Sequence, residues 1–139
     1  MPTFGVLRSS SGANKMAREA MTTFQVLPSY EADYARITVA GTPTIGQLIS
    51  LTELLAVDSR SWAQPLLLLD LRQVETRFAF TDQFRLGEAG ARNLGHLRKL
   101  ASVVPPDRIT HVSEKAANHG GANVRVFTDE AEAVAWLLE

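Results

Sequence analysis

The alternation of apolar and polar residues becomes regular near Phe24 and continues to the end of the chain. Residues 24–27 and 34–39 are rich in apolar and β-branched side chains, a composition typical of strands. The connection between them begins at Pro28 and is turn-like, and so short a connection favours an antiparallel pair. Residues 1–22 show no comparable period and include a run of small polar side chains. We therefore predict a flexible N-terminal tail over 1–22 and one domain over 23–139.

Three further segments have the composition of strands. Residues 66–71 open with a continuous run of leucines, which is typical of a strand buried on both faces of a parallel sheet. Residues 99–104 and 123–127 are also rich in apolar and β-branched side chains, and Pro105 ends the first of them. These segments predict the centre and the far edge of the sheet.

The first two predicted helices lie on either side of the leucine run. Thr44 is a candidate N-cap for a helix over 45–57. Leu51 and Leu54 widen the apolar face of this helix, so the whole face packs in the core or part of it meets a partner. The second helix is predicted to begin at Thr81 and to run to about residue 97.

Two shorter helices complete the pattern. One lies near 112–119 and ends at a pair of glycines, and the other follows Asp129, where Glu132 fits a capping box. The resulting order is β-β-α-β-α-β-α-β-α. It predicts a single α/β domain with about five strands in a mostly parallel sheet, the first strand antiparallel, and four main helices packed on the sheet.

The composition excludes several classes of function. The 139 residues are 45% hydrophobic and 21% charged, an ordinary balance for one globular domain. The absence of cysteine removes disulfides and thiolate chemistry and fits a cytoplasmic protein. A net charge of −1 gives no general attraction to nucleic acid, and no apolar run is long enough to span a membrane. The start of the chain also lacks the apolar segment of a signal peptide.

No pattern for a metal or a phosphate cofactor stands out. Gly87, Gly90 and Gly95 fall inside a predicted helix, where close packing against a neighbouring element explains them better than a phosphate loop does. His111 and His119 are too far apart along a helix to share one metal ion. We therefore expect no metal and no cofactor.

The sequence also lacks a nucleophilic triad. Ser59 and Ser61 lie in a predicted loop with no nearby histidine, and no nucleophile elbow occurs. An enzyme would require Asp70, His96 or His111 to meet in a cleft. We therefore expect a protein without enzymatic activity.

The most informative stretch follows the leucine run. In open α/β sheets, ligands and partners meet the carboxyl ends of the strands, and this strand ends near residue 71. Arginines beside phenylalanines at that edge suit a protein partner or an amphipathic ligand. The alternative is that the phenylalanines belong to the core and the arginines are solvated. The candidate rim residues are Asp70, Arg72, Arg77, Phe78, Phe80, Thr81 and Phe84.

Two stretches resemble the SpoIIAA-like (STAS/SEC14-type) family of bacterial proteins. Residues 124–137, VRVFTDEAEAVAWL, are similar to the closing strand and helix of that family, and residues 67–71, LLLDL, are similar to its buried central strand. The order of elements over 24–139 agrees as well. The resemblance implies a sheet of about five strands with helices on both faces, and it implies no enzymatic activity.

The resemblance also implies regulation by serine phosphorylation, but this chain departs from the family pattern at the phosphorylated site. STAS proteins of the anti-sigma antagonist type bind partners under the control of a phosphorylated serine in an Asp-Ser-Ser-Gly pattern. That serine lies at the start of the helix after the central strand. The corresponding stretch here, 75–81, is ETRFAFT and contains no serine. Thr81 is the hydroxyl residue nearest the helix start, and its simpler role is an N-cap.

Two hypotheses for the function follow. The leading one is a regulatory or protein-interaction module of the STAS type that lacks the serine phosphoswitch. The alternative is a carrier for a small apolar or amphipathic, lipid-like ligand, which is motivated by the wide apolar face of the helix over 45–57 and by the aromatic residues from Phe78 to Phe84. The SEC14 side of the resemblance also implies an apolar ligand pocket. Leu51 with Leu54, or the small face of Gly87, Gly90 and Ala91, could also pack in a homodimer.

Overall fold

The computed structural model describes residues 24–139, so the predicted tail over 1–22 lies outside the described residues. The described part opens with strands β1 (Phe24–Tyr30) and β2 (Ala35–Gly41), which form an antiparallel hairpin. Strand β1 continues through Pro28, which the sequence pattern placed in the turn. An edge strand tolerates proline because one side of its backbone has no partner strand.

The remaining strands are β3 (Leu66–Val74), β4 (Lys99–Val103) and β5 (Val124–Phe127). They pair in parallel, and the order across the sheet is β1-β2-β3-β4-β5. The predicted fold class is therefore confirmed, including the antiparallel first strand.

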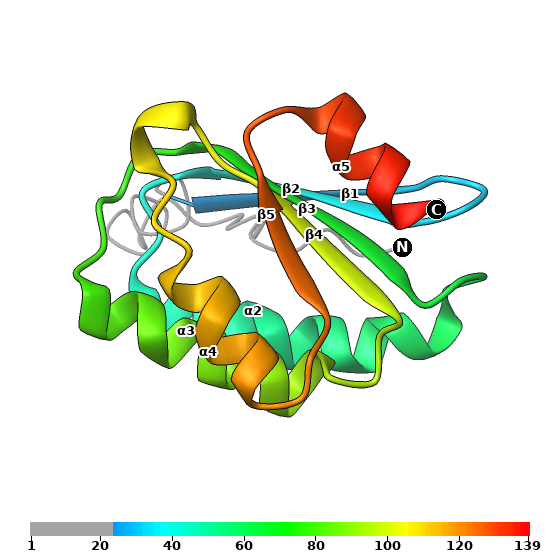
Figure 1. The fold of residues 1–139 in the computed structure, drawn as a ribbon, viewed down its shortest axis with the longest axis horizontal. Coiled ribbons are helices and arrows are strands. Elements are labelled where there is room, and N and C mark those ends of the chain that lie inside the picture. The colour runs from blue at the N-terminus through cyan, green and yellow to red at the C-terminus, as the bar shows by residue number, and fades with distance from the viewer. Residues whose placement is uncertain (1–23) are drawn as a thin grey trace, which may run out of the picture.

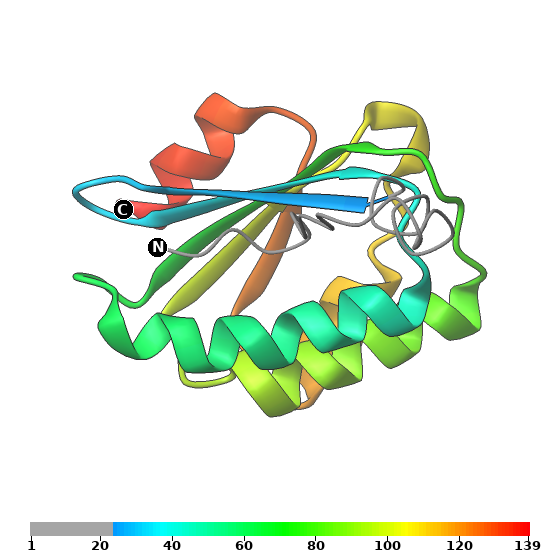
Figure 2. The ribbon, with the colours of Figure 1, turned by 180° about the vertical axis from the view of Figure 1, so that it is seen from behind.

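Helices cover the two faces of the sheet unequally (Figures 1 and 2). Strands β2 to β5 lie side by side in the order in which they occur along the chain. Because each crossover between them is right-handed, all three crossover helices lie on the same face of the sheet. That face carries α2 (Ile45–Asp58), α3 (Phe80–Leu94) and α4 (Val112–His119). The other face carries α5 (Glu130–Leu137), which packs on β3, β4 and β5. Short 3-10 turns, η2 (Ser59–Ser61) and η3 (Pro106–Arg108), lie in two of the connections.

The leucine run of β3 serves both sides of the sheet. Leu67 packs among the buried side chains beneath α2 and α3, whereas Leu66 and Leu68 pack with Ala133 and Leu137 of α5. Successive side chains of a strand point to opposite faces, so a strand covered on both faces needs a continuous apolar run. No helix in the described part of the chain is both long enough and apolar enough to span a bilayer.

The predicted N-caps are confirmed at two of three positions. Thr44 and Gln47 form a complete capping box at the start of α2, and the Asp129 side chain accepts the Glu132 amide at the start of α5. The prediction for Thr81 is wrong. Helix α3 begins at Phe80, and its N-cap is Ala79, which has no side chain able to accept a hydrogen bond.

The small face of α3 is used within the chain. A Cβ atom added to Gly87 would lie 2.4 Å from the Ser113 carbonyl oxygen, and one added to Gly120 would lie 2.6 Å from the Ala91 Cβ. Helix α4 therefore already occupies most of the small face that was considered for a homodimer. On α2, Leu51 is buried in the core while Leu54 is exposed.

Candidate binding site at the carboxyl edge of the sheet

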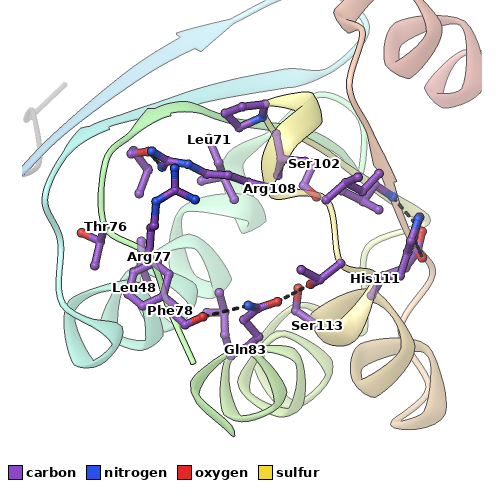
Figure 3. A pocket seen from close by; sticks show the side chains of 18 of the residues that line it. Leu48, Leu71, Thr76, Arg77, Phe78, Gln83, Ser102, Arg108, His111 and Ser113 are labelled. Carbon is purple, nitrogen blue, oxygen red and sulfur yellow. Dashed lines mark hydrogen bonds and ion pairs between the residues drawn. The ribbon is translucent and has the colours of Figure 1, made fainter. Parts of the chain in front are cut away.

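A cavity of about 280 Å³ opens at the carboxyl ends of β3 and β4, above the N-terminal ends of α3 and α4 (Figure 3). The labelled side chains in the figure surround its opening. Apolar walls come from the strands, from α2 and α3, from the loop before α3 and from the connection between β4 and α4. Polar groups come from both of these connections, from β4, and from the first turns of α3 and α4. The apolar lining includes Leu48, Leu71, Val74, Phe78, Leu86, Val104, Ile109 and Val126.

A glutamine side chain that lines the cavity connects two of the segments around it. Gln83 on α3 donates through Nε2 to the Phe78 carbonyl oxygen at 2.9 Å and accepts a hydrogen bond from the Thr110 hydroxyl. The loop before α3 and the segment before α4 are therefore joined through one side chain (Figure 3). A cross-link of this kind orients both segments around the opening.

Two acid–base pairs lie at the rim of the cavity. Arg77 lies 3.6 Å from Asp107, and both side chains are well exposed. His111 Nδ1 lies 2.7 Å from Glu114 Oε1, and the second oxygen of Glu114 accepts the Val126 amide at 2.8 Å. Each of the two carboxylates that line the cavity therefore already has a partner.

His111 also has an unusual backbone. Its φ of 63° lies in the left-handed region, and it is the one residue other than glycine with a positive φ in the described part of the chain. Side chains with a Cβ atom adopt this region at a cost, and such residues concentrate at binding sites. The strained backbone lies at the N-cap of α4, directly on the cavity lining.

Arg108 differs from the other charged side chains of the lining. Its Nη1 donates to the Val74 carbonyl oxygen. Its Nε is the single buried side-chain nitrogen or oxygen without a hydrogen-bond partner among residues 24–139. A buried polar atom of this kind calls for an explanation, because an unmade hydrogen bond costs stability.

The phenylalanines predicted for the rim take two different positions. Phe78 is half-buried, packs against the core and lines the cavity. Phe80 is 67% exposed and Phe84 is 49% exposed, one turn apart on α3. Thr81 lies between them and is also exposed. Core packing therefore applies to Phe78, whereas Phe80 and Phe84 lie on the surface.

The structure does not bring Asp70 and Arg72 to this cavity. Both lie on the α5 face of β3, where the Asp70 carboxylate is 2.8 Å from Arg36 and 2.9 Å from Arg72. The same two arginines bind Glu130 at the start of α5, at 2.9 and 2.6 Å. Burial raises the pKa of Asp70, but hydrogen bonds and positive charge from Arg72 and Arg36 outweigh it, and the pKa lies below its ordinary value.

His96 and Ser59 contact each other away from the cavity, whereas His111, Ser102 and Ser113 line it. Ser59 Oγ lies 2.8 Å from His96 Nε2, so the expectation of no histidine near this serine is wrong. The loops between α2 and β3 and between α3 and β4 lie side by side, although they are distant in sequence. Ser59 Oγ also donates to the Ala56 carbonyl oxygen, and no described cavity is lined by this pair.

Among the described residues, no group of three or more histidines and carboxylates is arranged to hold a metal ion. The three candidates for catalysis are also separate, since Asp70 pairs with arginines, His96 with Ser59 and His111 with Glu114.

Sequence reasoning missed Gln83 and Arg108, and it considered His111 only as a possible metal ligand or catalytic residue. The available signal was weak: Pro105 and Pro106 mark a turn after β4, and a turn at the carboxyl edge of a parallel sheet is a common place for binding residues. Nothing in the sequence shows that this turn places Arg108 across the end of β3.

Comparisons with known proteins agree on the fold. The sequence profile of the SpoIIAA-like family matches residues 34–138. A crystal structure of an anti-sigma factor antagonist from Mycobacterium paratuberculosis is similar, with a TM-score of 0.60 and 14% identity, over 84% of this chain and 95% of that one. An uncharacterised protein with a SpoIIAA-like fold from Shewanella loihica is similar with a TM-score of 0.52 and 18% identity, over 82% and 93% of the two chains. The search among curated proteins gave no match.

The structural likenesses have low identity and establish the fold, whereas the profile match covers most of the chain. The resemblance noted in the sequence is confirmed, and the chain belongs to the SpoIIAA-like family.

Proposed function

We propose that this protein is a non-enzymatic regulatory module that binds a folded protein partner through the first turns of α3. The observation that carries the proposal is the exposure of two large aromatic side chains one helical turn apart. Phe80 is 67% exposed and Phe84 is 49% exposed. Aromatic side chains are enriched among the residues that dominate binding energy at protein interfaces, and here they form one continuous strip.

The position of the strip supports the proposal. It begins the helix after the central strand, where the resemblance to anti-sigma antagonists places the regulated surface. This chain has Thr81 and no serine there, and the hydroxyl of Thr76 donates to the Pro43 carbonyl oxygen at 2.8 Å. We therefore propose partner binding without a serine phosphoswitch. The absence of cysteine supports a reducing cytoplasm as the setting.

The arrangement of titratable groups supports a non-enzymatic role. Asp70 is enclosed by arginines, His96 contacts a serine away from the described cavities, and His111 contacts Glu114. A catalytic acid and base need to face one reacting group, and these three residues face three different places.

A pair of matched double variants tests the docking surface. Phe80→Ser with Phe84→Ser removes the strip, and Leu54→Ser with Val57→Ser removes a similar exposed apolar pair from α2. Tagged wild-type and variant proteins are compared for the proteins recovered from host extract by chemical cross-linking. We expect one partner that is lost with the α3 variant and kept with the α2 variant. Equal recovery by both variants would contradict the proposal.

A second candidate function is favoured by the cavity itself. Its volume and apolar walls suit a small apolar or amphipathic ligand, which this protein would carry or sense. Native mass spectrometry of gently purified protein tests it through a consistent added mass. Ser102 lines the cavity from β4, and Ser102→Phe should fill it and remove the added mass. The absence of any added mass in the wild type, or an added mass that persists in the variant, would count against the carrier.

A further inference from the structure

We propose that the cavity binds an amphipathic monoanion whose carboxylate is held by Arg108 and whose apolar tail lies against the walls. This inference rests on the second candidate function above, because it requires that the cavity takes a ligand. It adds the chemical class of that ligand and the residue that selects it.

Other arginines of the same molecule show how a guanidinium binds a carboxylate here. Arg36 donates through Nε and Nη2 to the two oxygens of Glu130, at 3.2 and 2.9 Å. Arg72 donates through Nε and Nη2 to the two oxygens of Asp70, both at 2.9 Å. In each pair, the Nε–Nη2 edge makes a bidentate contact, the geometry in which arginine recognises carboxylates most strongly.

Arg108 has the same edge without a carboxylate. Its Nη1 donates to the Val74 carbonyl oxygen, which holds one end of the guanidinium, and its Nε has no hydrogen-bond partner among the described residues. Nε is shielded from solvent, so the edge has to turn slightly toward the cavity to receive a ligand. A bound carboxylate would then accept from Nε and Nη2 together, which explains the one orphaned buried donor.

The charges of the lining set the charge of the ligand. Arg77 pairs with Asp107, and Glu114 accepts from His111 and from a backbone amide. Arg108 is the one cation of the lining that lacks an acidic partner. One uncompensated positive charge matches a monoanion better than a phosphate dianion. The N-terminal ends of α3 and α4 also face the opening and favour negative charge there.

The apolar walls set the rest of the ligand. Phe78, Leu86 and Ile109 line the cavity on the side of α3 and η3, and Leu71 and Val74 line it from β3. A tail of several methylene groups would be removed from water there, and this favours binding in proportion to the apolar area that is buried. A carboxylate alone would gain no such burial, so a short polar acid is expected to bind weakly.

The experiment is a titration of the full chain, followed by amide chemical shifts, with three probes: octanoate, octanol and acetate. Octanoate has the head and the tail, octanol has the tail alone, and acetate has the head alone. We expect octanoate to shift the amide signals of Thr110, Ser113 and Gln83. We also expect its affinity to exceed that of octanol by on the order of tenfold, as one charge-assisted contact allows.

Three variants assign the head group. Arg108→Met keeps the length of the side chain and removes its charge, and it should abolish the preference for octanoate over octanol. Arg108→Lys keeps the charge without the fork and should retain part of the preference. Arg77→Met is the matched control, because Arg77 lines the same cavity but pairs with Asp107, and it should leave the preference unchanged.

The outcomes separate this inference from the carrier function. Equal binding of octanoate and octanol by the wild type, with shifts at the cavity, would support a ligand cavity and overturn the anionic head group. A preference that survives in Arg108→Met, or that is lost equally in Arg77→Met, would also overturn it. Shifts from neither probe would overturn both. Unchanged thermal unfolding of the variants confirms that the comparison is made on folded protein.

Discussion

Asp70 and Arg36 form an ion pair of 2.8 Å between neighbouring parallel strands, with Asp70 on β3 and Arg36 on β2. The Asp70 residue is 2% exposed, so its carboxylate is almost completely removed from water. Arg72 donates hydrogen bonds to both carboxylate oxygens of Asp70, and both arginines also form ion pairs with Glu130 at the start of α5. The network therefore joins the first turn of α5 to β2 and β3, which supports a structural role for Asp70.

Replacing Asp70 tests this assignment. Asp70→Ala leaves the guanidiniums of Arg36 and Arg72 with Glu130 as their remaining carboxylate partner. Breaking a buried ion pair from one side costs about 3 to 5 kcal/mol, and the partial exposure of both arginines places this case near the lower end. We expect urea unfolding at neutral pH to report a loss of about 3 kcal/mol.

A second aspartate provides the control for this measurement. Asp107 also pairs with an arginine, but at 3.6 Å and with both side chains about two-thirds exposed. Exposed pairs contribute little, so Asp107→Ala should change the unfolding free energy by less than about 1 kcal/mol. Equal losses for the two variants would show that the network around Asp70 contributes no more than a surface pair.

The same network predicts a loss of stability in acid. The pKa of Asp70 lies below its ordinary value for the reasons given above, and hydrogen bonds from Arg36 outweigh burial in lowering the pKa of Glu130. In the unfolded chain, both carboxyls titrate near pH 4. Because the folded pKa values are lower, this contribution is complete above about pH 5 and disappears as the pH falls through the folded values.

Urea unfolding followed from about pH 6 down to about pH 3 measures this effect. The unfolding free energy should fall as the pH drops below about 4. Glu130→Gln removes one of the two titrating groups and should make the fall less steep. An acid limb of equal slope in the variant and the wild type would contradict the role of Glu130.

The sequence predicted those parts of the fold that depend on local pattern. The leucines of β3 point alternately into the buried clusters on the two faces of the sheet, and this arrangement requires the continuous apolar run seen in the sequence. Thr44 was predictable as a cap because its partner Gln47 is three residues away. Phe78, Phe80 and Arg77 line the cavity at the carboxyl edge because they follow the strand that ends there.

The sequence could not predict contacts that depend on which way a side chain points or on distant segments meeting. Asp70 and Arg72 lie near the end of β3, the strand that Arg77 follows. Alternation turns their side chains to the α5 face, where their ion-pair network includes Glu130, which is 60 and 58 residues further along the chain. Ser59 and His96 meet because two helix–strand loops lie side by side. Thr81 has the favoured chemistry of a cap, but the N-cap position falls two residues earlier, at Ala79.

The two tyrosines of the chain predict how its stability changes at alkaline pH. Burial raises the pKa of Tyr30, and the hydrogen bond to Asp58 at 2.6 Å adds to it; burial and Glu31 raise the pKa of Tyr34. An unfolded tyrosine titrates near pH 10, so this contribution to stability is present below about pH 10 and is lost as the pH rises through the folded values. Phenolate absorbance should appear at higher pH in the folded protein than in urea. Asp58→Asn should lower the Tyr30 pKa and leave Tyr34 unchanged, and an unshifted titration would contradict the role of Asp58.

Two glycines on α3 should respond in opposite directions to the same substitution. A Cβ on Gly87 would lie 2.4 Å from the Ser113 carbonyl oxygen and 2.7 Å from the Ala116 Cβ, so Gly87→Ala must push α4 away. Overpacking of this kind costs about 1 to 3 kcal/mol, more than the helix propensity gained. A Cβ on Gly90 would meet nothing within 4 Å, so Gly90→Ala should stabilise the protein by up to about 1 kcal/mol. Thermal unfolding should therefore show a lower midpoint for the first variant and a higher one for the second. A raised midpoint in both would mean that α3 and α4 are packed less closely than the structure shows.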